Sequence, residues 1–296
     1  MRKYKHYLIV LISIIVVIVV NTLSAYKKTS VKTNSNYAIE GVGFYIKEKN
    51  GDTVKELDIN KIDSYEFVLI NNSSSDKELC LSILYGYIQE DFKIENEIMN
   101  VYNFTIESQN EVVLPVKLLK KLNTENHSSY IFTFVENKNK ELKKELNYTF
   151  TAKVKNQDNN KVNYTIEDKN SNIAYEEFEF DGLNIIPEVN VENEEYISIN
   201  TDKVNIPIIV GGGDVSDYLV YCLVNGKQEY IDGNPTKRYK IKEKHAIKDN
   251  IEISLESNGL NQVRLYIVEN PESQNLKSYQ IETSKTLNFL REEQNE

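Results

Sequence analysis

The chain of 296 residues is 40% hydrophobic and 27% charged, and it carries a formal net charge of −10. This composition is that of a globular protein and excludes a disordered one, and the length suits two domains of ordinary size. The acidic balance argues against nucleic acid as a partner, because binding to phosphates requires an excess of Lys and Arg. The frequent use of Asn, Lys, Ile and Tyr is typical of an AT-rich genome and indicates a bacterial source.

The first 28 residues combine a basic start with a long apolar run. Three cations and the free amine precede the run Tyr7 to Val20, in which Ser13 is the only strongly polar residue. An uncharged stretch of this kind is stable in hydrocarbon only as a helix. Residues 7–25 would span close to the roughly 30 Å of a bilayer core at about 1.5 Å per residue. We predict a signal-anchor or transmembrane helix over residues 1–28, with the lipid bilayer as the partner of residues 7–25.

Cleavage or retention of this helix stays open. The strictly apolar part is short and is typical of a secretory signal, whereas Leu23 and Ala25 fit the preference of signal peptidase poorly and Lys27 and Lys28 follow directly. The basic start keeps the N-terminus in the cytoplasm by the positive-inside rule. We expect a single-pass protein of the cell membrane whose C-terminal part lies outside at the cell surface, or a secreted protein if the segment is cleaved.

The remaining sequence consists of short β-branched and aromatic runs separated by turn-forming clusters, with hardly any helical periodicity. Strands at this spacing are typical of antiparallel β-sandwiches. We predict an all-β chain of two tandem immunoglobulin-like sandwiches after the N-terminal hydrophobic helix. Its parts would be a stalk over residues 29–36, domain 1 over 37–155, a linker or connecting strand over 156–182, domain 2 over 183–284 and a polar tail over 285–296.

The predicted strands, in chain order, are Gly43–Ile46, Tyr65–Ile70, Leu79–Ile88, Val101–Ile106, Val112–Val116, Tyr130–Val135 and Tyr148–Val154 in domain 1, and Ile185–Ile186, Tyr196–Ile199, Val204–Val210, Tyr218–Val224, Arg238–Lys242, Ile251–Leu255, Val263–Val268 and Tyr279–Ile281 in domain 2.

The two sets of strands follow the same order, which indicates a divergent repeat. In each set a strand pair joined by a loop is followed by a strand that ends in Val-Glu-Asn, at residues 135–137 and 268–270. Cys80 and Cys222 lie in the second strand of each pair, and in separate domains they would exceed the roughly 7 Å between Cα atoms that a disulfide allows. We therefore favour two buried free thiols, although an exported location also permits a disulfide.

Catalytic and metal-binding motifs are missing from the sequence. We find no His-Glu-x-x-His, no Cys-x-x-Cys, no Gly-x-Ser-x-Gly and no phosphate-binding Gly-Lys-Ser/Thr loop. The oxygen-bearing residues from Asp168 to Glu179 have the spacing of an EF-hand loop, but Ile173 stands where that loop requires Gly. We predict that the protein is not an enzyme and that it has no cofactor, no catalytic residues and no metal site.

One basic stretch is the candidate binding site. In a strand, Arg238, Lys240, Lys242 and Lys244 would project from one face and form a row about 20 Å long. Such a row on an acidic protein would suit an anionic polymer of the cell envelope or the membrane surface itself. The alternative is a charged edge strand that prevents unwanted sheet pairing.

These observations favour a membrane-anchored or secreted extracytoplasmic module with a binding or structural role in the cell envelope, exerted through loops and sheet edges. Its partner would be an anionic envelope polymer or another surface protein. Two alternatives stay open. One is an envelope hydrolase that uses a carboxylate pair not visible in the sequence, and the other is a subunit of a membrane complex.

Overall fold

The computed structural model describes residues 41–119, 129–136, 147–154, 166–167, 173–174, 184–188, 196–212, 217–255, 258–272 and 280–292. The predicted helix of residues 1–28, the stalk and most of the predicted linker lie outside these ranges, so those predictions stay predictions. Among the described residues no helix is long and apolar enough to cross a membrane. All described residues belong to one compact unit, Ala38–Glu296.

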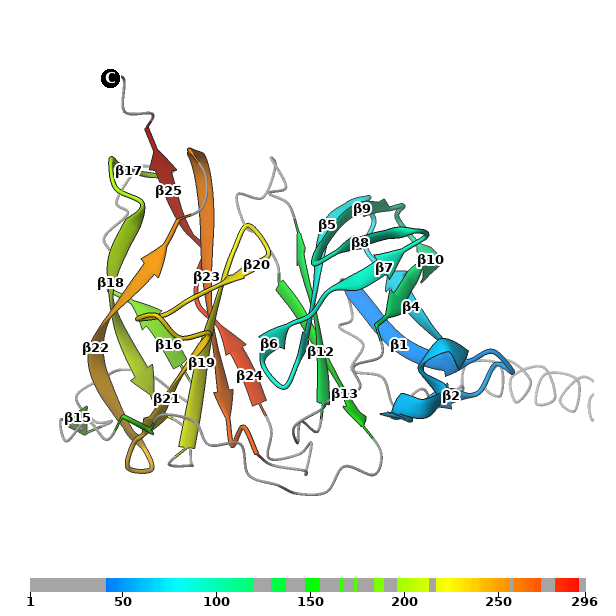
Figure 1. Ribbon diagram of the computed structural model, residues 1–296, viewed down its shortest axis with the longest axis horizontal. Helices are drawn as coiled ribbons and strands as arrows, with labels where there is room; N and C mark the ends of the chain where they lie inside the picture. The colour runs from blue at the N-terminus through cyan, green and yellow to red at the C-terminus, as the bar shows by residue number, and fades with distance from the viewer. Residues whose placement is uncertain are drawn as a thin grey trace, which may run out of the picture. The chain divides into compact units, whose positions relative to one another are not determined.

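The all-β prediction is confirmed, since strands make up nearly all of the regular structure in the described residues (Figure 1). The N-terminal half, residues 41–154, contains β1 (Val42–Glu48), β2 (Thr53–Val54), β3 (Glu56–Leu57), the 3-10 helix η1 (Ile59–Ser64), β4 (Tyr65–Asn71), β5 (Lys77–Tyr85), β6 (Ile88–Gln89), β7 (Phe92–Ile94), β8 (Glu97–Met99), β9 (Val101–Ile106), β10 (Asn110–Leu114), β11 (Val116–Leu118), β12 (Ser129–Glu136) and β13 (Asn147–Val154).

The C-terminal half, residues 166–292, contains β14 (Ile166–Glu167), β15 (Ile173–Ala174), β16 (Asn184–Pro187), β17 (Ile197–Ile199), β18 (Lys203–Gly211), β19 (Asp217–Val224), β20 (Lys227–Glu229), β21 (Thr236–Lys240), β22 (His245–Ser254), β23 (Gly259–Glu269), β24 (Gln280–Thr283) and β25 (Leu287–Arg291).

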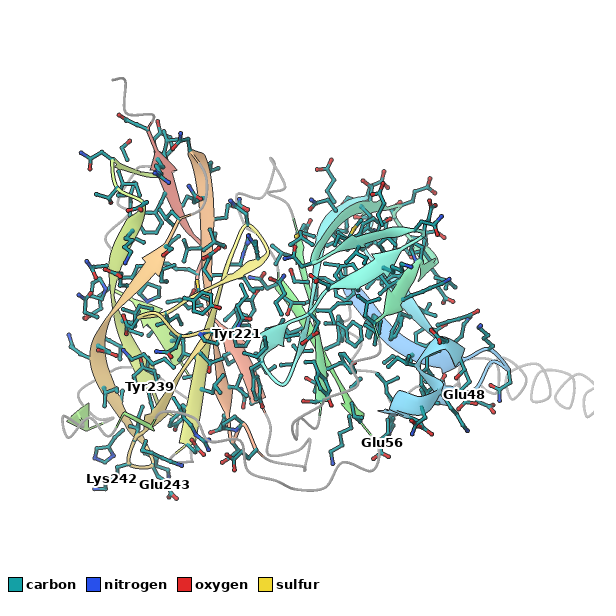
Figure 2. The ribbon with its side chains drawn as sticks, viewed as in Figure 1. Glu48, Glu56, Tyr221, Tyr239, Lys242 and Glu243 are labelled. Atoms are coloured by element: carbon teal, nitrogen blue, oxygen red, sulfur yellow. The ribbon has the colours of Figure 1, made fainter. Side chains whose placement is uncertain are left out.

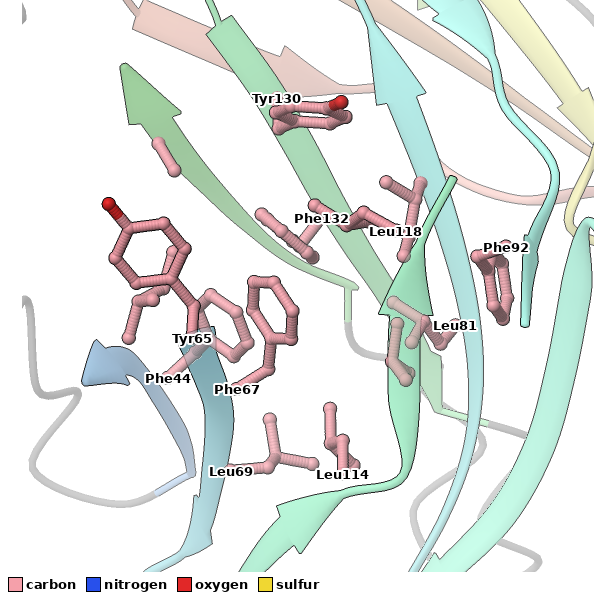
Figure 3. Packing of buried hydrophobic residues seen from close by; sticks show 14 of the residues in the cluster. Phe44, Tyr65, Phe67, Leu69, Leu81, Phe92, Leu114, Leu118, Tyr130 and Phe132 are labelled. Atoms are coloured by element: carbon pink, nitrogen blue, oxygen red, sulfur yellow. The ribbon is translucent and has the colours of Figure 1, made fainter. Parts of the chain in front are cut away.

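The N-terminal half encloses one apolar cluster between two sheets. One sheet has the order β10-β4-β1-β2, the other has the order β3-β13-β12-β5-β6 with β9 also paired to β5, and a small sheet β11-β7-β8 lies beside them. Phe44 and Phe67 from the first sheet meet Phe132 from the second at ring-centroid distances of 4.8 and 5.2 Å (Figure 3). Burial of such rings supplies about 2–3 kcal/mol each.

The C-terminal half repeats this arrangement around its own apolar cluster. One sheet has the order β14-β21-β19-β23-β25-β17 and the other has the order β15-β22-β18-β16. Strands β16, β18 and β22 pair as β1, β4 and β10 do, and β19, β23 and β25 pair as β5, β12 and β13 do. In both halves a short strand, β3 or β17, joins the last strand in parallel. Two segments of different sequence thus follow one pairing scheme.

The end of the chain differs from the prediction. Residues 285–296 were expected to form a polar tail, but β25 pairs with β23 along its length and with β17 on its other side. Leu287 and Phe289 are buried in the apolar cluster of the C-terminal half. The alternation of these two apolar residues with Asn288 is the period of a half-buried strand, so the structure extends to at least Glu292.

The two cysteines are free and buried, as favoured from the sequence. Their positions are nevertheless not equivalent. Cys222 points into the apolar cluster of its own half, whereas Cys80 lies on the opposite face of β5 from Leu79 and Leu81. When β5 and β19 are aligned on the tight turns that follow them, Cys80 corresponds to Leu219 and not to Cys222. Burial raises the pKa of Cys80 to about 11, so it is not a reactive thiolate.

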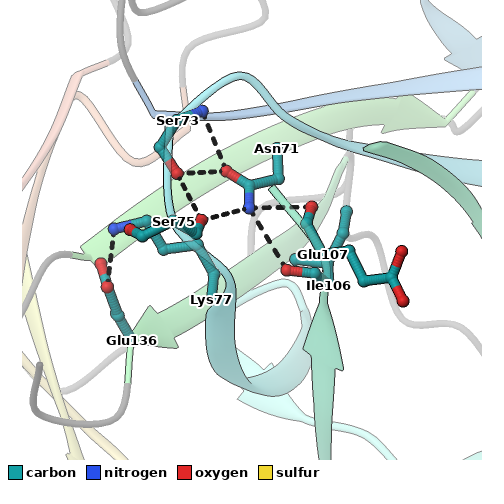
Figure 4. Close-up of polar contacts among 7 residues, drawn as sticks. All are labelled: Asn71, Ser73, Ser75, Lys77, Ile106, Glu107 and Glu136. Carbon is teal, nitrogen blue, oxygen red and sulfur yellow. Dashed lines mark hydrogen bonds and ion pairs between the residues drawn. The ribbon is translucent and has the colours of Figure 1, made fainter. Parts of the chain in front are cut away.

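A buried asparagine shapes the loop between β4 and β5. The Asn71 side chain is fully buried and its Nδ2 donates to the carbonyl oxygens of Ser75, Ile106 and Glu107, at 2.8, 3.2 and 3.0 Å (Figure 4). Its Oδ1 accepts from the Ser73 amide at 3.0 Å. These bonds satisfy backbone groups that the loop leaves without ladder partners, and they tie it to the end of β9.

Candidate functional site

The predicted basic row is not formed. Strand β21 ends at Lys240, and Lys242 and Lys244 lie in the turn before β22, where the His245 amide donates to the Lys242 carbonyl at 3.0 Å. Lys242 lies on this turn, at the lower left of the C-terminal half in Figure 2. Lys242 and Lys244 are exposed, Lys240 is half-buried and Arg238 is only 5% exposed. A single strand face therefore presents Arg238 and Lys240 but not all four cations.

Arg238 is engaged in ion pairs within the C-terminal half. Its Nε donates to Asp217 Oδ1 at 2.7 Å, a second guanidinium nitrogen contacts the other oxygen of Asp217, and a third contacts Glu272 at 2.7 Å. Lys240 Nζ lies 2.9 Å from Asp217. A guanidinium held by two carboxylates joins β21 to β19 and to the turn after β23. The observed role of Arg238 is structural, and its binding to an anionic ligand stays a prediction.

The cluster formed by Asp217, Arg238, Lys240 and Glu272, called the Asp217 cluster below, makes the stability of the fold depend on pH in the acid range. Burial alone would raise the pKa of Asp217, but hydrogen bonds from Arg238 and Lys240 outweigh it and hold that pKa below the usual value of 3.8. A carboxyl with a lowered folded-state pKa contributes stability above pH 4, and that contribution is lost as the pH falls through the folded-state pKa.

We expect D217N to be less stable than wild type at pH 7 and to lose less further stability on acidification, with a slope smaller by up to about 1.4 kcal/mol per pH unit. Urea unfolding of both chains between pH 7 and pH 2.5 measures this. Parallel curves for the two chains would show that the Asp217 carboxylate is not stabilised by the fold.

A second cluster surrounds Lys237 on the inner face of β21. Its Nζ contacts Asp232, lies 2.8 Å from Asp249 and sits 5.7 Å from the centre of the Tyr239 ring. The Tyr239 hydroxyl donates to Asp249 Oδ2 at 2.9 Å. These contacts tie the turn at residues 231–234 to β22. Lys237 thus lies between the two carboxylates.

These clusters differ from the carboxyl pair that a hydrolase needs. A general acid requires a carboxyl whose pKa is raised, whereas the pKa of Asp217 is lowered by its cationic neighbours. Within the described ranges no group of three or more His, Cys, Asp and Glu residues could hold a metal ion. The envelope-hydrolase alternative gains no support from the placement of Asp217.

An extensive contact in the described residues joins the two halves, and no motif in the sequence predicts it. A third apolar cluster contains side chains from both halves on the faces of β5, β12, β19 and β23 that point away from each half's own core. Its buried members are Leu84, Tyr87, Ile131, Leu219, Tyr221, Leu223, Tyr266 and Val268.

Two tight turns at the edge of this cluster exchange matching hydrogen bonds. Residues Gly86 and Tyr87 join β5 to β6, and Asn225 and Gly226 join β19 to β20, with positive φ at all four residues. That pattern is characteristic of two-residue type I′ hairpins. The second residue after each turn is a glutamine, Gln89 in the N-terminal half and Gln228 in the C-terminal half.

The two glutamines contact each other reciprocally. The Gln89 amide donates to Gln228 Oε1 at 2.7 Å, and the Gln228 amide donates to Gln89 Oε1 at 2.7 Å. The side-chain nitrogen of Gln89 donates to the Gly226 carbonyl at 2.9 Å, and that of Gln228 donates to the Tyr87 carbonyl at 2.8 Å. Each glutamine therefore makes the same contact with the other, and such reciprocity is characteristic of a two-fold symmetric interface. The halves associate as the subunits of a symmetric dimer do.

Further bonds close the same contact. The Ser82 hydroxyl donates to the Gly226 carbonyl, and the Tyr87 hydroxyl donates to the Pro271 carbonyl beside Glu272. A Cβ placed on Gly226 would lie 2.6 Å from Cys80 Sγ. The turn of the C-terminal half therefore packs directly on β5, with space only for glycine.

A different surface, on the outer face of the N-terminal half, carries the exposed apolar side chain of Val113. In the sheet β10-β4-β1-β2 the outward residues Val113, Val68 and Tyr45 stand opposite one another on three adjacent strands. Val113 is 51% exposed, whereas Val68 is fully buried. The Tyr45 hydroxyl reaches Glu111 Oε1 on β10 at 2.8 Å, so its side chain crosses β4.

Comparison with known proteins assigns no family. No protein-family model matches the chain, and no curated protein sequence matches it. Among solved structures, the one described as the crystal structure of CBD12 from CALX1.2 shares 6% sequence identity, with 76% of this chain and 92% of that chain covered, at a TM-score of 0.21. A similarity at this level assigns neither a family nor a function.

Proposed function

We propose that the protein is a membrane-anchored or secreted extracytoplasmic module with a binding or structural role in the cell envelope, built as two tandem immunoglobulin-like sandwiches. The common pairing scheme of the two halves supports the tandem architecture. The basic start and apolar run of residues 1–28 support the location.

The observation that carries this proposal is the reciprocal contact between the halves. Gln89, Gln228 and the shared apolar cluster bury the faces of β5, β12, β19 and β23 inside the molecule. A partner must then be engaged by the remaining loops, outer faces and sheet edges. A rigid two-part body on a membrane segment suits a spacer or an adhesive module, in which position and reach matter more than chemistry.

The anionic-polymer hypothesis now concerns Lys242 and Lys244, the exposed members of the predicted row, whereas Arg238 and Lys240 both contact Asp217. Binding of this kind would fall with salt over the range in which the Debye length shrinks from about 10 to about 3 Å. A K242E/K244E chain should lose it, whereas K203E, which changes an exposed lysine of β18, should not.

Fractionation of bacteria that express the full chain tests the location and the role together. We expect recovery with the membranes, an intact N-terminus and digestion of the C-terminal part by protease added to spheroplasts. Retention of the protein on envelope material, but not on cytoplasmic extract, would support the role. A chain found in the cytoplasm, resistant to added protease, would reject the proposal.

A further inference from the structure

Strand β10 forms an open edge of its sheet. In the order β10-β4-β1-β2 it is the terminal strand, and one of its sides pairs with β4 from Asn110 to Leu114. No strand among the described residues pairs with its other side. Natural edge strands are protected by short length, by charged side chains and above all lysine, by proline, by a bulge or by a covering segment. The five residues Asn-Glu-Val-Val-Leu of β10 contain neither lysine nor proline, and Glu111 is their one charge.

The corresponding strand of the C-terminal half is protected. Strand β22 pairs with β18 as β10 pairs with β4, and β15 adds to its free side through Ala246 and His245. Two of its outward side chains are charged and paired, since Lys248 contacts Glu188 and Glu252 contacts Lys203. The edge of β22 in the C-terminal half is thus covered by the short strand β15, whereas the equivalent edge of β10 in the N-terminal half has no such strand among the described residues.

The side chains beside the open edge define what would fit it. Val113 exposes half of its surface, and Glu111 lies two residues before it on the same face, at hydrogen-bond distance from Tyr45. An added antiparallel strand would place one residue opposite Val113 and the residue two further on opposite Glu111. An apolar side chain at the first position and a cation at the second would match this edge.

We propose that β10 accepts an extended segment of a partner polypeptide as an added antiparallel strand, with an apolar residue opposite Val113 and Lys or Arg opposite Glu111. The backbone of the edge supplies hydrogen bonds once the Glu111 amide releases Asn110 Oδ1, to which it donates at 2.9 Å, and the two side chains select the segment, as in other strand-addition complexes. This inference rests on the proposed function and deepens it, because it names the surface and the chemical class of the partner.

A designed peptide probes the edge directly. We would use the fluorescein-labelled peptide Thr-Thr-Val-Thr-Lys-Thr-Thr and measure its anisotropy against the full chain in detergent. We expect saturable binding that weakens at least tenfold in E111K, and a peptide with Glu in place of Lys should recover binding to E111K. The matched control is E252K on β22, which should bind the original peptide as wild type does.

Backbone pairing is tested separately from side-chain attraction. N-methylation of alternate peptide residues removes backbone N–H donors and keeps the side chains. We would methylate either the odd-numbered or the even-numbered residues of the peptide. Only one of these two peptides should lose binding, because only alternate residues donate to β10. No binding at 1 mM peptide, or binding indifferent to E111K and to methylation, would overturn the inference. Self-association of the chain that V113K abolishes would also overturn it, by making a second copy the occupant.

The outcomes separate the two proposals. A chain that is found outside the membrane and ignores the peptide rejects only the role of β10. A chain found in the cytoplasm rejects the proposed function, whatever the peptide does.

Discussion

Substitution of Gly226 by alanine is expected to destabilise the protein by about 2–4 kcal/mol and to loosen the contact between its halves. The backbone of Gly226 has a φ of 82°, which costs an L-residue about 1 kcal/mol. The new methyl group would also lie 2.6 Å from Cys80 Sγ and 3.3 Å from Ser82 Oγ, inside van der Waals contact. Overpacking of a buried site adds about 1–3 kcal/mol. Urea unfolding measures the sum.

Gly233 provides the matched control for this substitution. It also occupies a turn, with a φ of 81°, but no atom lies within 4 Å of the position a Cβ would take. G233A should therefore cost only the backbone term of about 1 kcal/mol. Removing the sulfur in a C80A background should bring the cost of G226A close to that of G233A. Equal costs for the two glycines in the wild-type background would contradict the packing of this turn against β5.

Breaking the buried ion pair of the N-terminal half is expected to have a similar or larger effect. Lys77 Nζ lies 2.7 Å from Glu136 Oε1, and the two side chains are 5% and 3% exposed. The pair joins the first residue of β5 to the last residue of β12 (Figure 4). K77M leaves a carboxylate buried without its cation, and loss of one partner from such a pair costs about 3–5 kcal/mol.

The double variant K77M/E136L separates the attraction between the two charges from the cost of burying them. Because burial of two charges opposes their attraction, replacing both with apolar residues should recover most of the stability lost in K77M. Denaturant midpoints at pH 7 with unchanged m-values would measure this. A loss in K77M below about 1 kcal/mol, the value for an exposed pair, would show that the two charges remain solvated.

The strands and the fold class could be predicted because each strand carries its own pattern of side chains. The continuous aromatic and aliphatic run in Tyr65–Ile70 and the alternation within Val101–Ile106 mark strands directly, and the observed β4 and β9 contain them. The strand within the predicted tail, β25, carries too weak a local pattern to be predicted. Leu287 and Phe289 are only two apolar residues, and their burial depends on β23 and β17, which lie elsewhere in the sequence.

The contact between the halves has a signal in the sequence of β5. The segment Leu79–Tyr85 is apolar or small on both faces, and all of its residues are buried in the structure. A strand that is buried on both faces needs a second layer outside its own core. The two turns followed by Gln89 and Gln228 are a second signal, although only the structure shows that these side chains meet.

The basic row could not be judged from spacing alone. Its geometry required a strand that continues past Lys240, and the chain turns there instead. The partners of Arg238 are Asp217 and Glu272, more than 20 residues away in sequence. Ion pairing between such distant positions is a property of the tertiary fold, so a stretch rich in cations does not reveal whether its charges are free.

Amide hydrogen exchange at Gln89 and Gln228 in the full chain tests the central claim, that the two halves form one body through a reciprocal contact. Each of these amides donates to the side chain of the other half. We predict that both exchange slowly and at similar rates, and that G226A accelerates both while leaving the amides of β4 and β18 protected. Rapid exchange at both glutamines in a chain whose β4 and β18 remain protected would show that the halves fold without joining, and would contradict the account.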